Sequence, residues 1–162
     1  MEDTLIKGKL KGSTLIELLT VAVIIIMVVS LFIPSYSKAK DSAIEAQAMR
    51  NLTNMANALN LFYLEKKYYP RDVQPNVAAP GLCPNYLGEW PLASDNQYNS
   101  SYDYEAWSMS GGNYWIGITW YGKNARRDSS MSTIMNQGSA FVIKKLGDDY
   151  YIEVDRNAKI GP

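Results

Sequence analysis

Two acidic residues, Asp103 and Glu105, are the first pair in this sequence whose types and spacing could do chemistry. Alternate residues of a strand point to the same face, so the two carboxyl groups would lie side by side. Such a pair can hydrolyse a glycosidic bond, and the nearby tryptophan residues could bind the sugar. Alternating acidic residues on a strand are ordinarily solvated, however, and we expect this pair to face solvent without catalysing a reaction.

Other catalytic signatures are missing from the sequence. Its 162 residues include no histidine and a single cysteine, Cys83. This excludes the commonest general base and any disulfide within the chain. The sequence also has no GxSxG, no CxxC and no glycine-rich phosphate loop. We therefore expect neither an enzyme nor a bound cofactor, and we expect Cys83 to be a buried small residue or a free thiol.

Two charged clusters could bind ions. The basic segment "KNARR", with Lys123, Arg126 and Arg127, could contact phosphate, but three basic residues in a turn are usually solvated. Sixteen basic and sixteen acidic residues cancel, so no overall charge attracts the chain to nucleic acid. The acidic residues near the carboxyl end, Asp148, Asp149 and Asp155, fit no metal-ligand spacing, including that of the EF-hand. We expect no nucleic-acid partner and no metal site.

The most unusual ionisable group is Glu17, at the start of an apolar run. From Leu18 to Ile33 only Thr20 and Ser30 are polar. As a helix, residues 13–33 would rise about 30 Å, the thickness of a bilayer core. A carboxylate inside such a span costs about 2.5–3.5 kcal/mol on insertion scales, which marks a functional group.

The basic residues ahead of the apolar run set its orientation. Lys7, Lys9 and Lys11 would hold the amino end in the cytoplasm. The sequence therefore predicts a single membrane-spanning helix, with everything after Pro34 on the far side of the membrane.

The hydrophobic period changes after the apolar run without an obvious break. The next apolar positions recur at steps of three and four, which is one stripe of an amphipathic helix: Ile44, Ala48, Leu52, Met55, Leu59 and Phe62. Pro34 could bend the helix without ending it. Lys66, Lys67 and Pro70 mark its carboxyl end. We expect one continuous helix from about residue 14 to residue 67.

The remainder of the chain predicts a small sheet. "SSYDYEAW" and "NYWIGITWY" flank Gly111-Gly112, and "AFVIKKL" and "YYIEVD" flank Gly147-Asp148, so each pair is typical of an antiparallel hairpin. Aromatic residues crowd the first hairpin, where cross-strand packing explains them and sugar binding is the alternative. A short helix capped by Asp128 or Ser129 and stopped at Gly138 would lie between the hairpins. The fold class is α+β, with a long amino-terminal helix packed on a small antiparallel sheet.

The amino-terminal pattern resembles a known family. A short basic leader ending in Gly12, then "STLIELL", then an apolar run to Pro34, is similar to the class III signal of type IV prepilins and type II secretion pseudopilins. The resemblance implies that a prepilin peptidase cuts between Gly12 and Ser13 and methylates the new amino terminus on Ser13. Ser13 departs from the family, in which phenylalanine is usual at this position.

The resemblance also implies roles for two residues in filament assembly. Glu17 stands at the family's glutamate, fifth in the mature chain, where it would pair with the amine on Ser13 of a neighbouring subunit. The alternative for Glu17 is a place at the headgroup boundary, where it complements the helix amino end. Pro34 stands at the family's helix-bending proline.

The family resemblance divides the chain into a leader (1–12), a transmembrane and filament-core helix (13–34), the amphipathic half of the same helix (35–69) and a sheet head domain (70–162). It implies a structural subunit of a type IV pilus-like filament, or alternatively a type II secretion pseudopilin. The implied partners are further copies of this chain, other pilins, the peptidase and an inner-membrane assembly platform. The protein would lie in the bacterial inner membrane and then in a periplasmic or extracellular filament.

A third hypothesis is a secreted or anchored carbohydrate-binding or carbohydrate-hydrolysing domain behind an ordinary signal peptide. Small residues at 35–37 could accept signal peptidase. Against this, sixteen residues is long for the apolar part of a signal peptide, and Glu17 is poorly placed near its start.

Overall fold

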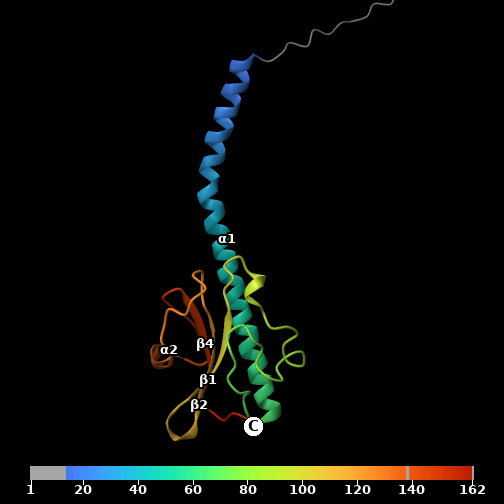
Figure 1. Ribbon diagram of the computed structural model, residues 1–162, viewed down its shortest axis with the longest axis vertical. Helices are drawn as coiled ribbons and strands as arrows, with labels where there is room; N and C mark the ends of the chain where they lie inside the picture. Colours follow the sequence, from blue (N-terminus) through green and yellow to red (C-terminus); the bar gives the residue numbers. More distant parts are fainter. Residues whose placement is uncertain (1–13, 138, 162) are drawn as a thin grey trace, which may run out of the picture. The chain divides into compact units, whose positions relative to one another are not determined.

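The computed structural model describes residues 14–137 and 139–161 and confirms the α+β class, with a long helix packed on a four-stranded antiparallel sheet (Figure 1). The elements in chain order are α1 (Leu15–Lys66), the 3-10 turn η1 (Ala93–Asp95), β1 (Tyr102–Ser108), the 3-10 turn η2 (Ser110–Gly112), β2 (Tyr114–Trp120), α2 (Met131–Gln137), β3 (Ile143–Leu146) and β4 (Asp149–Ala158). The chain divides into two compact units between Ser42 and Ala43, within α1.

The second half of α1 is amphipathic, as its sequence period predicts. Ala48, Leu52, Met55, Leu59 and Phe62 are buried, and Ile44 packs partly against the same core. The helix ends where its carboxyl cap forms. There Lys67 adopts a left-handed φ of 65° and its N–H donates to the Tyr63 carbonyl at 2.8 Å.

The sheet has the strand order β1-β2-β4-β3, and every neighbouring pair is antiparallel. Both predicted hairpins form. Tyr102 pairs with Trp120 at one end of the first hairpin, and Leu146 pairs with Asp149 beside the turn of the second. Gly147 has a φ of 64° in that turn, a conformation that glycine adopts at little cost.

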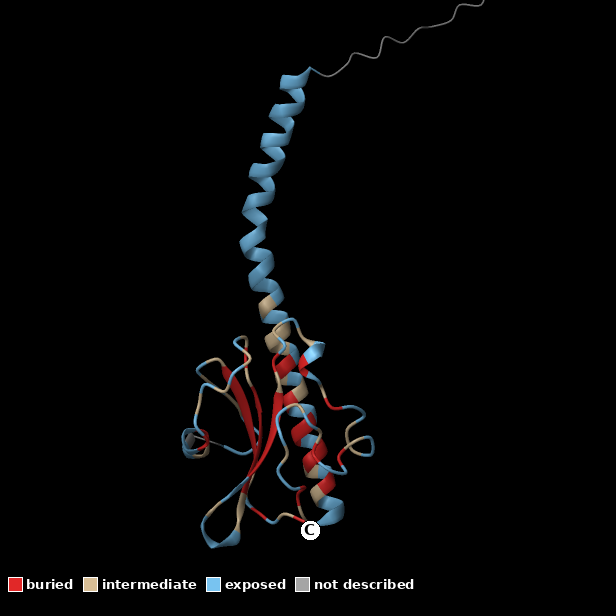
Figure 2. Cartoon of the chain, in the orientation of Figure 1, coloured by how far each residue is buried: buried red, intermediate tan, exposed pale blue. Residues whose placement is uncertain are grey.

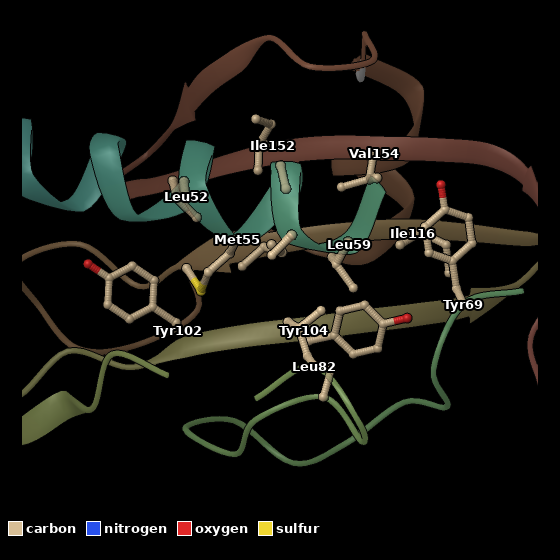
Figure 3. Close-up of a cluster of buried hydrophobic side chains, with 14 of the residues drawn as sticks. Leu52, Met55, Leu59, Tyr69, Leu82, Tyr102, Tyr104, Ile116, Ile152 and Val154 are labelled. Atoms are coloured by element: carbon tan, nitrogen blue, oxygen red, sulfur yellow. The ribbon is translucent and has the colours of Figure 1, made fainter. Parts of the chain in front are cut away.

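One face of the sheet packs on α1 and forms the main core (Figure 3). The sheet contributes buried side chains from alternate positions: Tyr102, Tyr104, Ala106, Ile116, Ile118, Trp120, Ile152 and Val154. The connector after α1 adds Tyr69 and Leu82. Because neighbouring residues of a strand point to opposite faces, the intervening residues face away from α1.

The opposite face of the sheet lies under the segment 121–142, which includes α2. Met131 and Ile134 of this segment pack on Trp115 and Tyr151 of the sheet. Ser130 caps α2: its carbonyl accepts from Ile134 N at 3.1 Å, and its hydroxyl lies 3.4 Å from Thr133 N. The predicted caps Asp128 and Ser129 are therefore wrong by one or two residues, and the predicted stop at Gly138 lies outside the described residues.

The connector between α1 and β1 is fixed along the outer edge of β1. Asn76 N–H donates to the Tyr102 carbonyl at 2.8 Å, and Ala106 N–H donates to Asp72 Oδ1 at 2.8 Å. Cys83, in this connector, is a half-buried free thiol, and burial raises its pKa. The loop thus supplies hydrogen bonds that a neighbouring strand would otherwise make.

Candidate functional site

The first half of α1 is apolar and exposed on all sides. Every residue from 14 to 40 is exposed, and the large apolar side chains of residues 15–33 expose between 41% (Val23) and 81% (Leu15) of their surface (Figure 2). By length and composition alone, α1 is the one candidate for crossing a membrane within residues 14–137 and 139–161. An apolar surface of this extent indicates an environment of lipid or of other helices.

The two hydroxyl groups within the apolar half of α1 are satisfied by its own backbone. Thr20 Oγ1 donates toward the Ile16 and Glu17 carbonyls at 3.0 and 2.9 Å, and Ser30 Oγ donates to the Met27 carbonyl at 2.7 Å. Hydrocarbon offers no hydrogen-bonding partner, so polar groups in a span must be satisfied internally. Both residues therefore fit a helix surrounded by lipid.

Glu17 lies in the first described turn of α1 and is exposed. Its backbone N–H approaches the Thr14 carbonyl at 3.0 Å and Thr14 Oγ1 at 3.3 Å, so Thr14 caps this end of the helix. A carboxylate in the first turn is stabilised by the helix dipole, typically by about 0.3–1 kcal/mol. This is less than the cost of about 2.5–3.5 kcal/mol for a charge within a span, so local capping alone does not account for it.

Pro34 lies inside α1, which continues past it to Lys66. Proline has no N–H and cannot donate to the carbonyl four residues earlier, here that of Ser30. The sequence expectation that α1 continues through Pro34 is confirmed. The expected cleavage and methylation positions, Gly12 and Ser13, lie outside the described residues.

The acidic pair Asp103 and Glu105 occupies the sheet face under the segment 121–142. Both carboxylates are buried, and both contact the guanidinium of Arg127; Asp103 also accepts from the Tyr121 hydroxyl. The expectation that these two carboxylates are solvated is wrong, because the segment 121–130 covers them. Arg127 lies in that segment and is partly exposed, but it binds both carboxylates instead of facing solvent alone. With Arg127 bound between them, the two carboxylates serve as structural acceptors.

Burial controls the ionisation of this cluster. It raises the pKa of Asp103, against the hydrogen bond from Tyr121 and the charge of Arg127, which act to lower it. Burial and the Asp103 carboxylate together raise the pKa of the Tyr121 phenol.

Sequence reasoning missed Arg127 as the partner of the acidic pair Asp103 and Glu105. The available signal was an acidic pair on one face of a strand and a basic turn, residues 123–127, after the next strand. That pattern does not identify which arginine binds the pair.

The acidic residues of the β3–β4 turn also bind protein groups. Asp148 Oδ2 accepts from Lys123 and Asn124 N–H at 2.7 and 2.9 Å, and Asp149 Oδ2 accepts from Asp128 and Ser129 N–H at 2.8 and 3.3 Å. Among the described residues, no group of three or more His, Cys, Asp or Glu could hold a metal ion. These carboxylates hold the covering segment on the sheet.

The aromatic residues of the first hairpin are mostly packed. Trp115 and Trp120 are fully buried, whereas Trp107 exposes 48% of its surface at the end of β1. Trp107 pairs across the strands with Trp115, and Tyr102 pairs with Trp120. Cross-strand packing therefore accounts for most of these rings, as the sequence indicates.

Comparison with known proteins gives one partial similarity. The chain is 33% identical over 79 residues to the type II secretion system core protein G of Escherichia coli (strain K12). The matched part is 47% of this chain and 54% of that protein, so the chain spans about half the length of this curated relative. No protein-family model and no solved structure matches the chain. This partial similarity supports the resemblance to the pilin and pseudopilin family, and the class III signal stays a prediction.

Proposed function

We propose that this chain is a structural subunit of a type IV pilus-like filament, held in the membrane by the apolar half of α1 and later polymerised through it. The observation that carries the proposal is the exposed apolar surface of residues 15–33, with Glu17 in its first turn. Apolar surface costs about 25 cal/mol per Å² in water. Such a helix therefore needs lipid before assembly and the helices of neighbouring subunits afterwards.

The secretion pseudopilus is the filament that the similarity favours. The partial identity to a type II secretion core protein supports this choice over an extracellular pilus. A single cysteine also departs from the paired carboxyl-terminal cysteines of many type IV pilins. The proposed location is the inner membrane, with the amino end cytoplasmic, followed by a periplasmic filament assembled with other pilin-like subunits on a membrane platform.

The proposed role of Glu17 is to pair with the amine of a neighbouring subunit. Cleavage between Gly12 and Ser13 by a prepilin peptidase would create that amine, which is methylated on Ser13. Two unit charges about 4 Å apart attract by roughly 4 kcal/mol in a partly screened setting, before desolvation is subtracted. This attraction exceeds the value of local capping and gives the carboxylate a reason to lie in the span.

Processing can be tested by mass spectrometry of the mature protein. We expect an amino terminus at a methylated Ser13, and we expect Gly12→Val to leave full-length precursor in the membrane, because a β-carbon obstructs the backbone at the cleavage site. A mature amino terminus at Lys38 would instead support an ordinary signal peptide and contradict the proposal.

The assembly role can be tested with Glu17→Leu as the sole subunit. The shortened chain should still appear in membranes by immunoblot, while filaments sheared from cells or seen by electron microscopy should fall sharply. An unpaired buried charge costs about 3–5 kcal/mol, which explains the loss. Glu89→Leu, an exposed acidic position in the second unit, is the matched control and should assemble normally. Normal filament yield from Glu17→Leu would leave Glu17 with a capping role only.

A further inference from the structure

A cleft of about 450 Å³ lies at the carboxyl end of α1, within the unit that contains the sheet. Its floor and walls come from α1, from the segments 68–71 and 80–86, and from Gly161. This volume falls in the range of small-molecule sites. Aromatic rings and a few polar groups line it, including Phe62, Tyr68, Tyr86, Arg71 and Asn85.

The aromatic walls of the cleft are held in place by one another. The Phe62 ring meets Tyr68 edge-on at a centroid distance of 5.7 Å and Tyr86 at 5.3 Å. Two glycines let the backbone approach these rings. A β-carbon on Gly81 would lie 3.3 Å from Phe62, and one on Gly161 would lie 2.2 Å from Tyr68. The cleft is therefore preformed, which lowers the entropic cost of binding.

Of the charged groups around the cleft, the Arg71 guanidinium has no acidic partner among the residues that the structure describes. Lys66 forms an ion pair with Glu65 at 2.8 Å, and Glu65 also accepts from the Tyr86 hydroxyl at 2.6 Å. Arg71 Nε donates to the Gly161 carbonyl at 3.3 Å. Among the ion pairs of residues 14–137 and 139–161, none includes Arg71.

We propose that this cleft binds a carboxylated sugar residue, such as a hexuronic acid within an acidic polysaccharide. The guanidinium of Arg71 suits the carboxylate, because its planar fork can donate two parallel hydrogen bonds. The tyrosine rings offer apolar surface to the C–H face of a sugar, and their hydroxyls, together with the Asn85 amide, suit its hydroxyl groups. This site does not depend on filament formation.

The binding experiment uses the full chain in a detergent that has no sugar headgroup. Calorimetric titration with trigalacturonate should show binding, and the neutral trisaccharide maltotriose should bind at least tenfold more weakly. A short acidic peptide is the third probe. Equal binding of the neutral sugar would overturn the role of Arg71, and tighter binding of the peptide would overturn the sugar as ligand.

Variants then test the lining residues. Arg71→Gln should weaken trigalacturonate binding at least tenfold, and Asn85→Ala should weaken it a few-fold. Arg126→Gln removes an exposed arginine elsewhere in the chain and should leave binding unchanged. Arg71→Lys retains the positive charge if the Gln variant fails to fold, and it should bind more weakly than the native chain because the fork is lost. Unchanged affinity in a folded variant at position 71 would refute the site.

Discussion

The two faces of the sheet are covered by different kinds of packing. On one face, α1 buries aliphatic and aromatic side chains against β1, β2 and β4 (Figure 3). On the other, the segment 121–142 buries a small apolar cluster together with carboxylates, among them Asp103, Glu105 and Asp149. The first face is held mainly by apolar burial, and the second depends on hydrogen bonds to charged groups.

This difference determines how each face responds to substitution. The free energy gained from apolar burial scales with the buried area, so removing a few buried atoms lowers stability in proportion to the area lost. A buried charge that loses its partner costs the full desolvation penalty, even though the intact pair adds little net stability. Removing one partner of a buried charge pair under the covering segment should therefore destabilise the protein strongly. Replacing all partners of the pair together by uncharged residues should cost much less stability.

Leu59→Asp should cause the largest change, because it places a charge in the apolar core. Leu59 is fully buried, whereas Leu61, two residues later on the same helix, exposes 54% of its surface. We expect Leu59→Asp to lower the free energy of unfolding by at least about 4 kcal/mol, combining cavity formation with an unpaired buried charge. Urea unfolding followed by tryptophan fluorescence measures it. Leu61→Asp should change little; similar losses at both positions would mean that the helix face is misassigned.

Arg127→Met should cost about 3–5 kcal/mol, because it leaves Asp103 and Glu105 buried without a cation. Adding Asp103→Asn and Glu105→Gln to the same chain should restore much of the loss, which a purely steric role for Arg127 does not predict. Arg126→Met, at the exposed neighbouring position, is the control and should stay within about 0.5 kcal/mol of the native chain.

Gly117→Ala should cost about 1–3 kcal/mol through overpacking on the second face of the sheet. A β-carbon at position 117 would lie 2.0 Å from the Trp115 ring, so the indole must move. Gly88→Ala is the matched control, since nothing lies within 4 Å of its β-carbon position. A native-like unfolding midpoint for Gly117→Ala would show that the ring has room to shift.

The smallest expected effect is on the pH dependence of stability. Burial acts to raise the pKa of Glu153, but hydrogen bonds from Arg156 and Trp115 hold it below its ordinary value. The stabilisation that the Glu153 carboxylate contributes is present above the unfolded pKa of a glutamate, about 4.3. It is lost as pH falls through the pKa of Glu153 in the folded protein. Burial raises the pKa of Asp103, so its contribution has the opposite pH dependence. The stabilisation from this carboxyl group is present below its unfolded pKa and is lost as pH rises through its folded pKa. Glu153→Gln should therefore flatten the acid side of the stability profile, and Asp103→Asn should not.

The helix-side core could be predicted from the sequence because its spacing is regular. The stripe from Ile44 to Phe62 and the two hairpins follow from period and turn residues alone. The burial of Asp103 could not be predicted, because its cover comes from an irregular segment without a period. The predicted cap of α2 is wrong for a related reason. Asp128 and Ser129 bind Asp148 and Asp149 at the β3–β4 turn, which leaves the capping of α2 to Ser130. Processing at Gly12 and Ser13 stays a prediction.

The hydrogen bonds that the connector makes along β1 have a consequence for self-association. An open sheet edge invites strand addition by another chain, and natural proteins blunt such edges with loops, short strands and lysines. The segment 72–76 occupies donors and acceptors of β1, while β3 at the other edge has four residues and carries Lys144 and Lys145. Strand addition between copies is thus disfavoured at both edges of the sheet. Many copies can therefore lie close together without forming amyloid through these edges.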